Sequence, residues 1–323
     1  MKSIVVEKNG GPEVLLLKDV PKPTVKPGHI LVKNSYAGVN YIDTYFRTGL
    51  YKGELPMVLG KEGAGVIEEV GEGVSGLKPG DRVAYLMGDS GAYAEYALVN
   101  PSFARVLPGG ISDKIGAAAL LQGMTAYCLA AKAYAVKGGD WVLVHAAAGG
   151  TGRLIVQVCR ALGANVIGTV STEEKAEVAR KAGAQHIIYY TRESVPERVK
   201  EITSNTGVRV VYDGVGKATF QASFDSLARL GYLIVFGNAS GKPDPVDISI
   251  LAKGNITLMR PQLYGFIATK EEFDEVTDQV FKLIEAGHLT IEVFKEYPLA
   301  DAAKAHIDLE GRKTTGKLLI AIQ

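Results

Sequence analysis

A regular alternation of strand-like and helix-like segments between Asp140 and Asp213 constrains the fold more than any other feature of the chain. WVLVH is followed by a glycine-rich loop and the apolar helical segment RLIVQVCRALG; then come NVIGTV, a charged helical segment over 172–182, HIIYY, a helix to about residue 203, and VRVVYD. Strands separated by helices of about ten to fifteen residues are typical of βαβ units, whose right-handed crossovers build a parallel sheet. The pattern predicts a doubly wound α/β domain.

Further elements follow this series. A helix is expected over 217–230, then a strand at YLIVFG and another at ITLMRPQ. The segment KEEFDEVTDQVFKLIEAG has a long helical pattern, which is expected to end with Gly287 as its C-cap. One more helix and a final strand are expected in the closing segment, which ends in TTGKLLIAIQ.

The first hundred or so residues have a different pattern. Short alternating runs such as SIVVE, AGVIEEVG and DRVAYL are separated by turns rich in glycine and proline, which predicts a compact antiparallel β domain. From about Ser112, DKIGAAALLQGMTAYCLAAKAYAV is apolar at helical spacing and predicts helices that lead out of this domain. With 323 residues the chain is long enough for two domains.

The loop AAAGGTG follows the strand at 141–145 directly. Ala147, Gly149 and Gly152 occupy the three small-residue positions of a dinucleotide fingerprint, with alanine in place of the first glycine. Small residues let the backbone turn tightly and approach a pyrophosphate, whose charge the following helix N-terminus stabilises. An ordinary glycine-rich turn is the alternative, but the surrounding βαβ series favours dinucleotide binding.

The end of the next strand indicates which dinucleotide is bound. NAD-specific sheets carry an acidic residue there, whereas NVIGTV ends in Ser171-Thr172, with Lys175 one turn into the helix. A hydroxyl and an ammonium suit a 2′-phosphate, which a carboxylate would repel, so NADPH is favoured over NADH. The alternative is that Ser171 and Glu174 form a capping box and that Lys175 is a solvated helix residue.

The stretch LGKEGAG has glycines at 60, 63 and 65 in the order G-x-x-G-x-G, which differs from the dinucleotide fingerprint. The residues after it alternate like a strand. These glycines are therefore interpreted as tight turns and close approaches within a strand. Lys61 is expected to form a structural ion pair with Glu62 or with another acid nearby.

Composition excludes several classes of function. Lysine plus arginine total 36 and aspartate plus glutamate 35, so no overall field attracts nucleic acid or an anionic membrane. No segment approaches the roughly 18 apolar residues that span a bilayer, and no secretory signal is recognisable. Cys128 and Cys159 lie in apolar helical segments and are expected to be buried structural thiols. A soluble cytoplasmic protein is predicted.

Motifs along the whole chain resemble those of a known family. In chain order they are AGVNYIDTYFRTGLY, LPMVLGKEGAGVIEEVG, GDRVAY, GAYAEY, LLQGMTAY, VHAAAGGTG, VVYDGVG, FGNASG, RPQL and RKTTGKLL. This set resembles the zeta-crystallin-like quinone oxidoreductases of the medium-chain dehydrogenase/reductase superfamily. The resemblance implies a GroES-like β-rich catalytic domain over 1–124 and 264–323, an inserted Rossmann domain over 125–263, and an active site in the cleft between them. It also implies a homodimer that uses NADPH to reduce quinones without a metal.

The resemblance also assigns site residues. Asn40 and Tyr45, in a loop, would lie beside the nicotinamide and the substrate carbonyl, and Asp43 would orient them, with Tyr51 a weaker candidate for the pocket wall. Gln122, which replaces a lysine of some relatives, is a catalytic-site candidate. Thr151 stands where relatives commonly have valine, and its hydroxyl is expected either to reach the pyrophosphate or to cap the helix. The further residues that the resemblance implies as cofactor contacts are Thr125, Val215, Gly237, Asn238, Ala239, Ser240, Pro261, Gln262, Leu263, Arg312 and Lys313, with a surface turn as the alternative for the last two. They add to the contacts expected from the motifs themselves, which are Gly149, Gly150, Gly152, Ser171 and Lys175. Tyr190, at the end of HIIYY, is expected either to lie beside the same 2′-phosphate or to be a plain strand-end tyrosine.

Three other functions compete with quinone reduction. Close relatives reduce the carbon–carbon double bond of enals and enones on the same scaffold. A zinc alcohol dehydrogenase needs thiolate or imidazole ligands, but in the G-H-E-x-x-G motif of the zinc-dependent branch this chain has Lys61 in place of the histidine. An RNA-binding or structural role is disfavoured by the near-zero net charge and by the absence of a basic run with interleaved aromatic residues. The identity of the proton donor stays open, with Tyr45 the preferred candidate.

Overall fold

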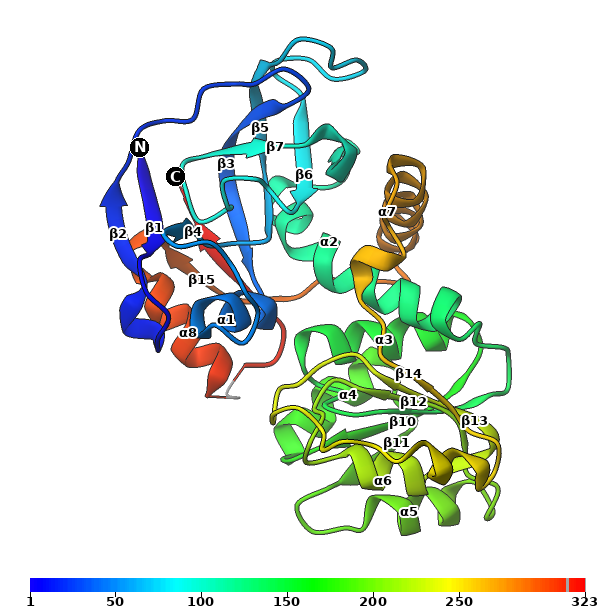
Figure 1. Cartoon of the computed structure of the whole chain (residues 1–323). Helices are drawn as coiled ribbons and strands as arrows, with labels where there is room; N and C mark the ends of the chain where they lie inside the picture. Colours follow the sequence, from blue (N-terminus) through cyan, green and yellow to red (C-terminus); the bar gives the residue numbers. More distant parts are fainter. Residues whose placement is uncertain (312–313, 323) are drawn as a thin grey trace. The chain divides into compact units, whose positions relative to one another are not determined.

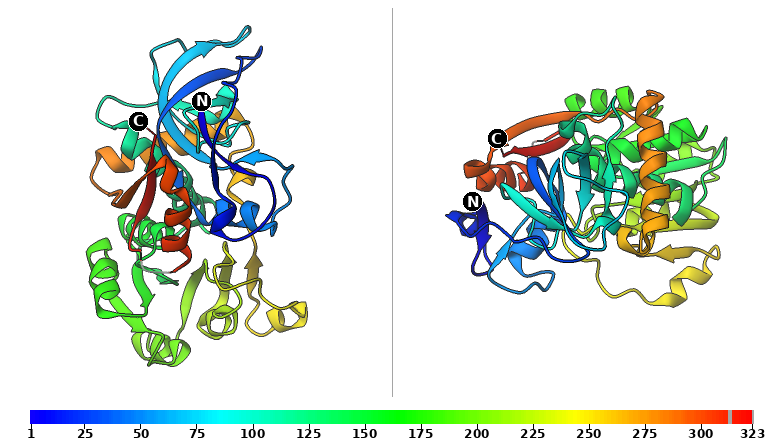
Figure 2. Two further views of the ribbon diagram at one scale, coloured as in Figure 1. Left: turned by 90° about the vertical axis from the view of Figure 1, so that its left-hand side faces the viewer. Right: turned by 90° about the horizontal axis from the view of Figure 1, so that it is seen from above.

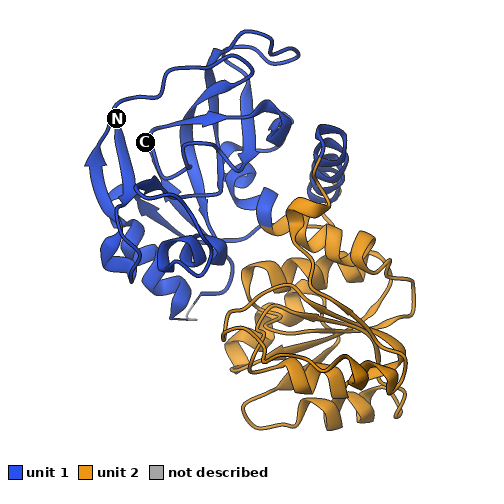
Figure 3. Cartoon of the chain, viewed as in Figure 1, with its two compact units in different colours: residues 1–121, 269–285, 291–323 blue, residues 122–268, 286–290 orange. Residues whose placement is uncertain are grey.

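The computed structural model describes residues 1–311 and 314–322 and divides into two compact units. Unit 1 consists of Met1–Leu121, Thr269–Glu285 and Ile291–Gln323, and unit 2 of Gln122–Ala268 and Ala286–Thr290 (Figure 3). The chain thus passes between the units a few residues from the predicted changes of domain, and the short stretch 286–290 belongs to unit 2. Each unit is described separately below.

Unit 2 is the predicted doubly wound domain. Its six strands are all parallel and lie in the order β11-β10-β9-β12-β13-β14. Helices α3 and α4 cover one face of the sheet, and α5 and α6 cover the other (Figure 1). The strands are β9 Trp141–Val144, β10 Asn165–Val170, β11 His186–Tyr189, β12 Val208–Asp213, β13 Leu227–Val235 and β14 Thr257–Met259, and the helices are α3 Gly150–Ala161, α4 Glu173–Ala182, α5 Val195–Ile202 and α6 Phe220–Asp225. The central strands β10, β9 and β12 are almost wholly buried because helices cover both faces of the sheet, whereas β14 at one edge is partly exposed.

The helix expected over 217–230 was wrong in its second half. Helix α6 ends at Asp225, and β13 begins at Leu227, which pairs with Val208 of β12. The register of this pair shifts between Val208 and Val210 of β12. In the matching stretch of β13, Leu230 has a φ of 62°. Pairing with β12 therefore extends the strand through residues whose composition suits a helix, since long-range partners override local propensity.

Unit 1 contains the predicted β domain. A seven-stranded sheet has the order β15-β16-β3-β5-β6-β8, with β7 paired to β3; β15–β16 is parallel and the other pairs are antiparallel. A second sheet has the order β2-β1-β4. The strands are β1 Lys2–Val6, β2 Leu16–Asp19, β3 Ile30–Val39, β4 Met57–Val58, β5 Glu62–Val70, β6 Arg82–Leu86, β7 Tyr96–Val99, β8 Ala104–Val106, β15 Val293–Pro298 and β16 Lys317–Ala321. Both chain ends lie in this unit, so β1 and β16 come from opposite ends of the sequence.

Four longer helices accompany these sheets. Helices α1 Tyr41–Thr48, α7 Lys270–Glu285 and α8 Ala302–Glu310 belong to unit 1, whereas α2 Asp113–Cys128 begins in unit 1 and ends in unit 2. Helix α7 is straight in the right-hand view of Figure 2, and Gly287 just beyond it has the positive φ (72°) expected near a helix C-terminus. No helix in the described parts of the chain is long and apolar enough to cross a membrane.

The segment after β3 was expected to be a loop, and this expectation was wrong. Residues 41–48 form α1, with Asn40 as its N-cap and Gly49 in the left-handed conformation (φ 79°) as its C-cap. The sequence N-Y-I-D places an acid three residues after the N-cap, which is where a capping box needs one. A helix sends Asp43 and Tyr45 to different faces, because residues two apart are about 200° apart around the axis.

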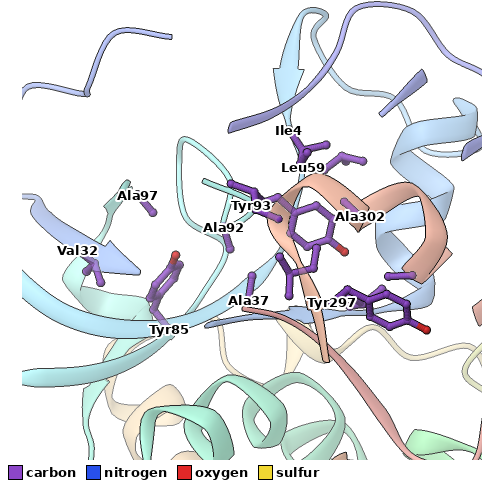
Figure 4. Packing of buried hydrophobic residues seen from close by; sticks show 14 of the residues in the cluster. Ile4, Val32, Ala37, Leu59, Tyr85, Ala92, Tyr93, Ala97, Tyr297 and Ala302 are labelled. Atoms are coloured by element: carbon purple, nitrogen blue, oxygen red, sulfur yellow. The ribbon is translucent and has the colours of Figure 1, made fainter. Parts of the chain in front are cut away.

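The interpretation of LGKEGAG as strand and turn is confirmed. Gly60 has a φ of 98°, and β5 begins at Glu62. A Cβ on Gly65 would lie 2.0 Å from the backbone oxygen of Lys33 on β3, so this strand pair has no room for a side chain there. The neighbouring core of unit 1 places Tyr93 among Ile4, Leu59 and Ala302 (Figure 4).

Candidate active site

The glycine loop of unit 2 has the geometry of a dinucleotide cradle. Gly149 is the N-cap of α3 in extended conformation, and no side chain caps this N-terminus, so Thr151 does not cap the helix. A Cβ on Gly152 would lie 2.3 Å from the backbone oxygen of Ala146, which makes glycine necessary for the close packing of helix and strand. The loop therefore presents uncapped N–H groups at a helix N-terminus, where a pyrophosphate is stabilised.

This loop lies at the point where the strand order of the sheet reverses. Strand β9 is flanked by β10 on one side and by β12 on the other, and the chain continues outward in both directions. The Ala147 N–H donates to Thr169 O (3.1 Å), and the His145 N–H donates to Tyr212 O (3.0 Å). Ligands of open α/β sheets bind outside the carboxyl ends of the strands at such a switch point. All the cofactor contacts expected after strands β9 to β14 follow the carboxyl ends of those strands.

The structure at the end of β10 contradicts one sequence-based alternative, the capping box of Ser171 and Glu174. Thr172, and not Ser171, is the N-cap of α4, because its hydroxyl accepts from the Lys175 N–H (3.3 Å). The proposed capping box of Ser171 and Glu174 is therefore absent. Ser171 precedes the helix and its carbonyl accepts from the Thr191 hydroxyl (3.4 Å), which brings the turn after β11 to the end of β10. Tyr190 in that turn is 48% exposed.

The nearest acid at this strand end is already engaged. Glu173 accepts from the Tyr189 hydroxyl and from Arg180 (2.8 Å). These contacts lower its pKa from the ordinary value, with the Tyr189 hydrogen bond as the largest cause. Its carboxylate is thus occupied by groups of β11 and α4, while Ser171 and Lys175 remain half-buried beside the strand end.

Asp213, which the sequence reasoning missed, fixes the turn that carries Val215. Its buried carboxylate accepts from the N–H groups of Val215 (2.8 Å) and Gly216 (3.0 Å) and from the hydroxyls of Thr219 and Ser223 (2.7 Å each). An acid that ends a strand directly before G-V-G was a readable signal, because such a carboxylate can accept from the turn that follows it.

The loop after β13 is joined to the same turn. Ser240 donates its hydroxyl to Val215 O and its N–H to the same oxygen (2.8 Å each). Gly237 and the buried Asn238 precede it, at the carboxyl end of β13. Gln262 is exposed and follows β14. The expected contacts at Val215, Gly237, Asn238 and Ser240 therefore form one connected group of loops.

Gln122 and Thr125 lie on the part of α2 that belongs to unit 2. The Gln122 amide lies against the glycine loop: a Cβ on Gly150 would be 2.5 Å from its Oε1 atom. Thr125, one turn later, is half-buried. The structure thus places Gln122 beside the N-terminus of α3.

In unit 1, Glu62 joins four elements. Its Oε2 atom accepts from Lys317 Nζ of β16 (2.5 Å) and from Asn40 Nδ2 at the start of α1 (2.9 Å), and its Oε1 atom accepts from the Leu121 N–H of α2 (2.7 Å). Lys317 Nζ also donates to Asn40 Oδ1 (2.7 Å). A Cβ on Gly38 would lie 2.3 Å from Glu62 Oε2, so glycine makes room for the carboxylate. We call Glu62, Lys317, Asn40 and the Leu121 N–H the Glu62 junction.

A second buried set begins at the same helix. Arg47 Nη1 lies 3.0 Å from His306 Nδ1, His306 Nε2 lies 3.2 Å from the Tyr93 hydroxyl, and that hydroxyl donates to Asp43 Oδ2 (3.0 Å). Because a guanidinium only donates, Nδ1 of His306 accepts and Nε2 carries the proton. We call Arg47, His306, Tyr93 and Asp43 the Tyr93 array. Every donor along it therefore points toward Asp43. Arg47 also forms a two-pronged pair with Glu310 of α8 (2.8 and 2.9 Å).

Burial dominates the electrostatics of the Tyr93 array. The Asp43 Oδ2 atom also accepts from the Asn40 N–H (2.9 Å), but its Oδ1 atom has no hydrogen-bond partner among the described residues. Burial raises the pKa of Asp43 to about 6, although the hydrogen bonds from Asn40 and Tyr93 and the charge of Lys317 oppose this. Burial, with a smaller effect of Arg47, lowers the pKa of His306 to about 3. His306 is therefore neutral at ordinary pH.

The tyrosines of the expected site lie close together. The rings of Tyr45 and Tyr51 meet edge to face with centroids 5.2 Å apart, and both side chains are half-buried. Among the described residues, Lys61 does not form the expected ion pair: its ammonium lies 4.5 Å from the centroid of the Phe46 ring, and Glu62 pairs with Lys317 instead.

The remaining predictions concern residues of other kinds. Arg312 and Lys313 lie outside the described residues. Cys128 and Cys159 are buried, as expected, and form no disulfide; burial raises the pKa of Cys159. Within 1–311 and 314–322, no three histidine, cysteine, aspartate or glutamate side chains gather in a way that could hold a metal ion.

Comparison with known proteins identifies both halves of the chain. Residues 26–109 match the alcohol dehydrogenase GroES-like domain, and residues 150–282 match the zinc-binding dehydrogenase family. The Escherichia coli K12 protein named quinone oxidoreductase 1 is 44% identical over 321 residues, which cover 98% of each chain. A Burkholderia protein named 2-haloacrylate reductase is 41% identical over 327 residues, 99% of this chain and 98% of that one.

Solved structures of similar proteins point to the same family. The crystal structure of Escherichia coli quinone oxidoreductase complexed with NADPH is 43% identical, superposes with a TM-score of 0.97 and covers 100% of both chains. Identity of this extent over the full length, together with the GroES-like and doubly wound units, settles the family. The chain belongs to the quinone oxidoreductases of the medium-chain dehydrogenase/reductase superfamily.

Proposed function

We propose that this protein is an NADPH-dependent quinone oxidoreductase that works without a metal. The observation that supports it most is the cofactor cradle of unit 2, in which the Gly152 loop at the N-terminus of α3 is combined with a β10 strand end that carries Ser171 and Lys175. Full-length relatives named quinone oxidoreductase, one of them solved with NADPH, support the same assignment.

The residues present fit this dinucleotide. The loop N–H groups suit a pyrophosphate. A 2′-phosphate beside β10 would meet the Ser171 hydroxyl, the Lys175 ammonium and the exposed Tyr190 hydroxyl, whereas the nearest acid, Glu173, is held by Tyr189 and Arg180. Val215, Asn238 and Ser240 are offered by connected loops at the same edge of the sheet.

The reaction transfers a hydride and a proton, so that a quinone becomes a quinol while NADPH becomes NADP⁺. The bound nicotinamide supplies the hydride. The protein contributes binding, orientation and stabilisation of the developing quinolate oxygen. We assign the last role to the phenols of Tyr45 and Tyr51, with Tyr45 as the preferred proton donor.

A second candidate function has a specific observation in its favour. The relative named 2-haloacrylate reductase is almost as similar to this chain as the relatives named quinone oxidoreductase. Its name describes reduction of a conjugated carbon–carbon double bond, which also accepts a hydride and a proton. A carboxylate substrate of that kind would need a cation in the pocket.

A substrate panel distinguishes the two functions. Oxidation of NADPH by the purified protein is followed with an ortho-quinone, an alkenal and a 2-haloacrylate as acceptors. We expect the quinone to give the largest kcat/KM, by at least about tenfold. Rapid turnover of the alkenal or the haloacrylate with no quinone reduction would refute the first function and support the second.

Lys175→Ala tests the cofactor assignment. Because the Lys175 ammonium is proposed to face the 2′-phosphate, its removal should raise KM for NADPH by about tenfold and leave KM for NADH within about twofold. Both constants are measured with the same quinone. Lys181→Ala, an exposed lysine at the other end of the same helix, is the matched control. Equal effects of Lys175→Ala on the two cofactors would remove the phosphate argument.

The metal, the assembly and the location are part of the same proposal. The position of the zinc-ligating histidine of the superfamily is taken by Lys61, whose ammonium lies over Phe46, and the adjacent Glu62 is neutralised by Lys317. Neither group is then a ready ligand for zinc. A homodimer is proposed from the family resemblance, and a cytoplasmic location from the two buried cysteines, which form no disulfide.

A further inference from the structure

The Glu62 junction contains two deeply buried charged groups of unit 1. The side chains of Lys317 and Glu62 are 1% and 0% exposed, and Asn40 is 2% exposed. Removing two charges from water is costly, and an apolar pair of similar size often stabilises a protein equally well or better. The fold alone therefore gives little reason for an ion pair at this place.

The junction does fix the orientation of one amide. An ammonium can only donate and a carboxylate can only accept, so Lys317 selects Oδ1 of Asn40 and Glu62 selects its Nδ2. A rotation of the amide by 180° would place two donors against each other and two acceptors against each other. Asn40 therefore has one orientation that satisfies both charges.

Asn40 is also the residue that starts α1. Its N–H donates to Asp43 Oδ2 and its carbonyl accepts from the Asp43 N–H (3.1 Å). Because Tyr45 lies in α1 five residues after Asn40, the position of Asn40 sets where α1 begins and where the phenol of Tyr45 lies.

We propose that Lys317 and Glu62 are positioning residues for hydride transfer, which act by holding the Asn40 amide and the first turn of α1 in a single arrangement. The proposal rests on the proposed function. Lys317 is contributed by β16 near the C-terminus, Glu62 by β5 and Asn40 by the end of β3, so the sheet of unit 1 brings together three distant parts of the sequence. Gly38 makes this approach possible, because any side chain there would meet the Glu62 carboxylate.

The test replaces the ion pair with a neutral pair of similar volume, Lys317→Met with Glu62→Gln. The glutamine can still accept from the Leu121 N–H, and no unpaired charge is left in the interior. We expect a thermal midpoint close to that of the wild type and an unchanged dissociation constant for NADPH. The hydride-transfer rate should fall about tenfold to a hundredfold, because a small misplacement of reacting groups is costly. NADPH deuterated on the transferred side should then show a larger isotope effect on kcat.

The matched control is Arg105→Met with Asp278→Asn, which neutralises a half-exposed ion pair of the same unit. It should leave the rate and the isotope effect unchanged. A neutral Lys317/Glu62 double variant with wild-type stability, rate and isotope effect would overturn the proposal, since the pair would then be structural alone. If the control variant slows hydride transfer as much as the test variant does, the proposal is also overturned.

Two further measurements make the result independent of folding and of the proposed function. If the neutral pair does not fold, Lys317→Arg keeps the charge but presents a wider fork of donors, which shifts the Asn40 amide; a wild-type rate in this variant would overturn the proposal. The unaltered protein is assayed in parallel. Its failure to oxidise NADPH with any quinone or conjugated alkene would refute the proposed function, and with it the role assigned to the pair.

Discussion

Gly152→Val should weaken NADPH binding about tenfold to a hundredfold, because valine cannot be accommodated where α3 meets the loop after β9. Its Cβ alone would lie 2.3 Å from the Ala146 backbone oxygen, and a backbone atom cannot rotate away as a flexible side chain can. Relief requires a shift of the loop, and overpacking of this kind typically costs about 1–3 kcal/mol. The dissociation constant is measured by the quenching of protein fluorescence on titration with NADPH, and folding is checked by circular dichroism.

Gly138→Ala is the matched control for this substitution. Gly138 lies in the same unit, and a Cβ there would meet its nearest neighbour, Leu162 O, at a comfortable 3.9 Å. Its NADPH affinity should equal that of the wild type. If Gly152→Val binds NADPH with wild-type affinity, the cradle at the N-terminus of α3 is not the pyrophosphate site.

Asp43→Asn should gain stability relative to the wild type as the pH rises from about 4.5 to about 7.5. The pKa of Asp43 is raised to about 6 in the folded protein from an ordinary value of 3.8. The folded state then binds a proton more tightly than the unfolded state between these values, so the wild type loses stability as the pH rises through them. Because a tenfold change in proton affinity corresponds to about 1.4 kcal/mol, the wild type loses about 2 kcal/mol over this range. Asparagine has no such ionisation.

The measurement is the difference between the urea-unfolding free energies of the two proteins at several pH values in this range. His306 changes stability in the opposite sense: its pKa is lowered to about 3, so its contribution is lost as the pH falls below about 6.5. His306 is present in both proteins, and its effect largely cancels in the difference. Asp278→Asn, a substitution at a half-exposed acid, serves as the control. A constant difference between Asp43→Asn and the wild type would show that Asp43 is ionised in the folded protein throughout.

Local pattern was sufficient to predict unit 2 and much of unit 1. The alternation from Asp140 to Asp213 predicts β9 to β12 in the right order because parallel strands are buried on both faces and leave continuous apolar runs. The start of β13 was missed because SLARLG carries no such run, and the pairing of Leu227 with Val208 cannot be read from the sequence. Helix α1 was missed because its eight residues form a short pattern, although the N-Y-I-D capping signal was present.

The candidate site could be predicted where it consists of residues that are close together in the sequence. The glycine loop and the β10 strand end follow from local motifs, and the structure adds that Thr172 caps α4. The Glu62 junction and the Tyr93 array could not be predicted from local pattern, since residues 40, 62 and 317 meet through the sheet. A lysine directly before the apolar run LLIA was the one available signal, because a charged residue at the start of a buried strand requires a partner.

The saturated carboxylate of Asp213 bears on the entropy of cofactor binding. Since the N–H groups of Val215 and Gly216 are already bound to it, the turn that carries Val215 is ordered before any ligand arrives. A ligand that binds a preorganised loop does not lose affinity to the cost of ordering that loop. The turn after β12 is thus preorganised by Asp213, whereas Tyr190 and Gln262 are exposed and are free to change conformation when a ligand binds.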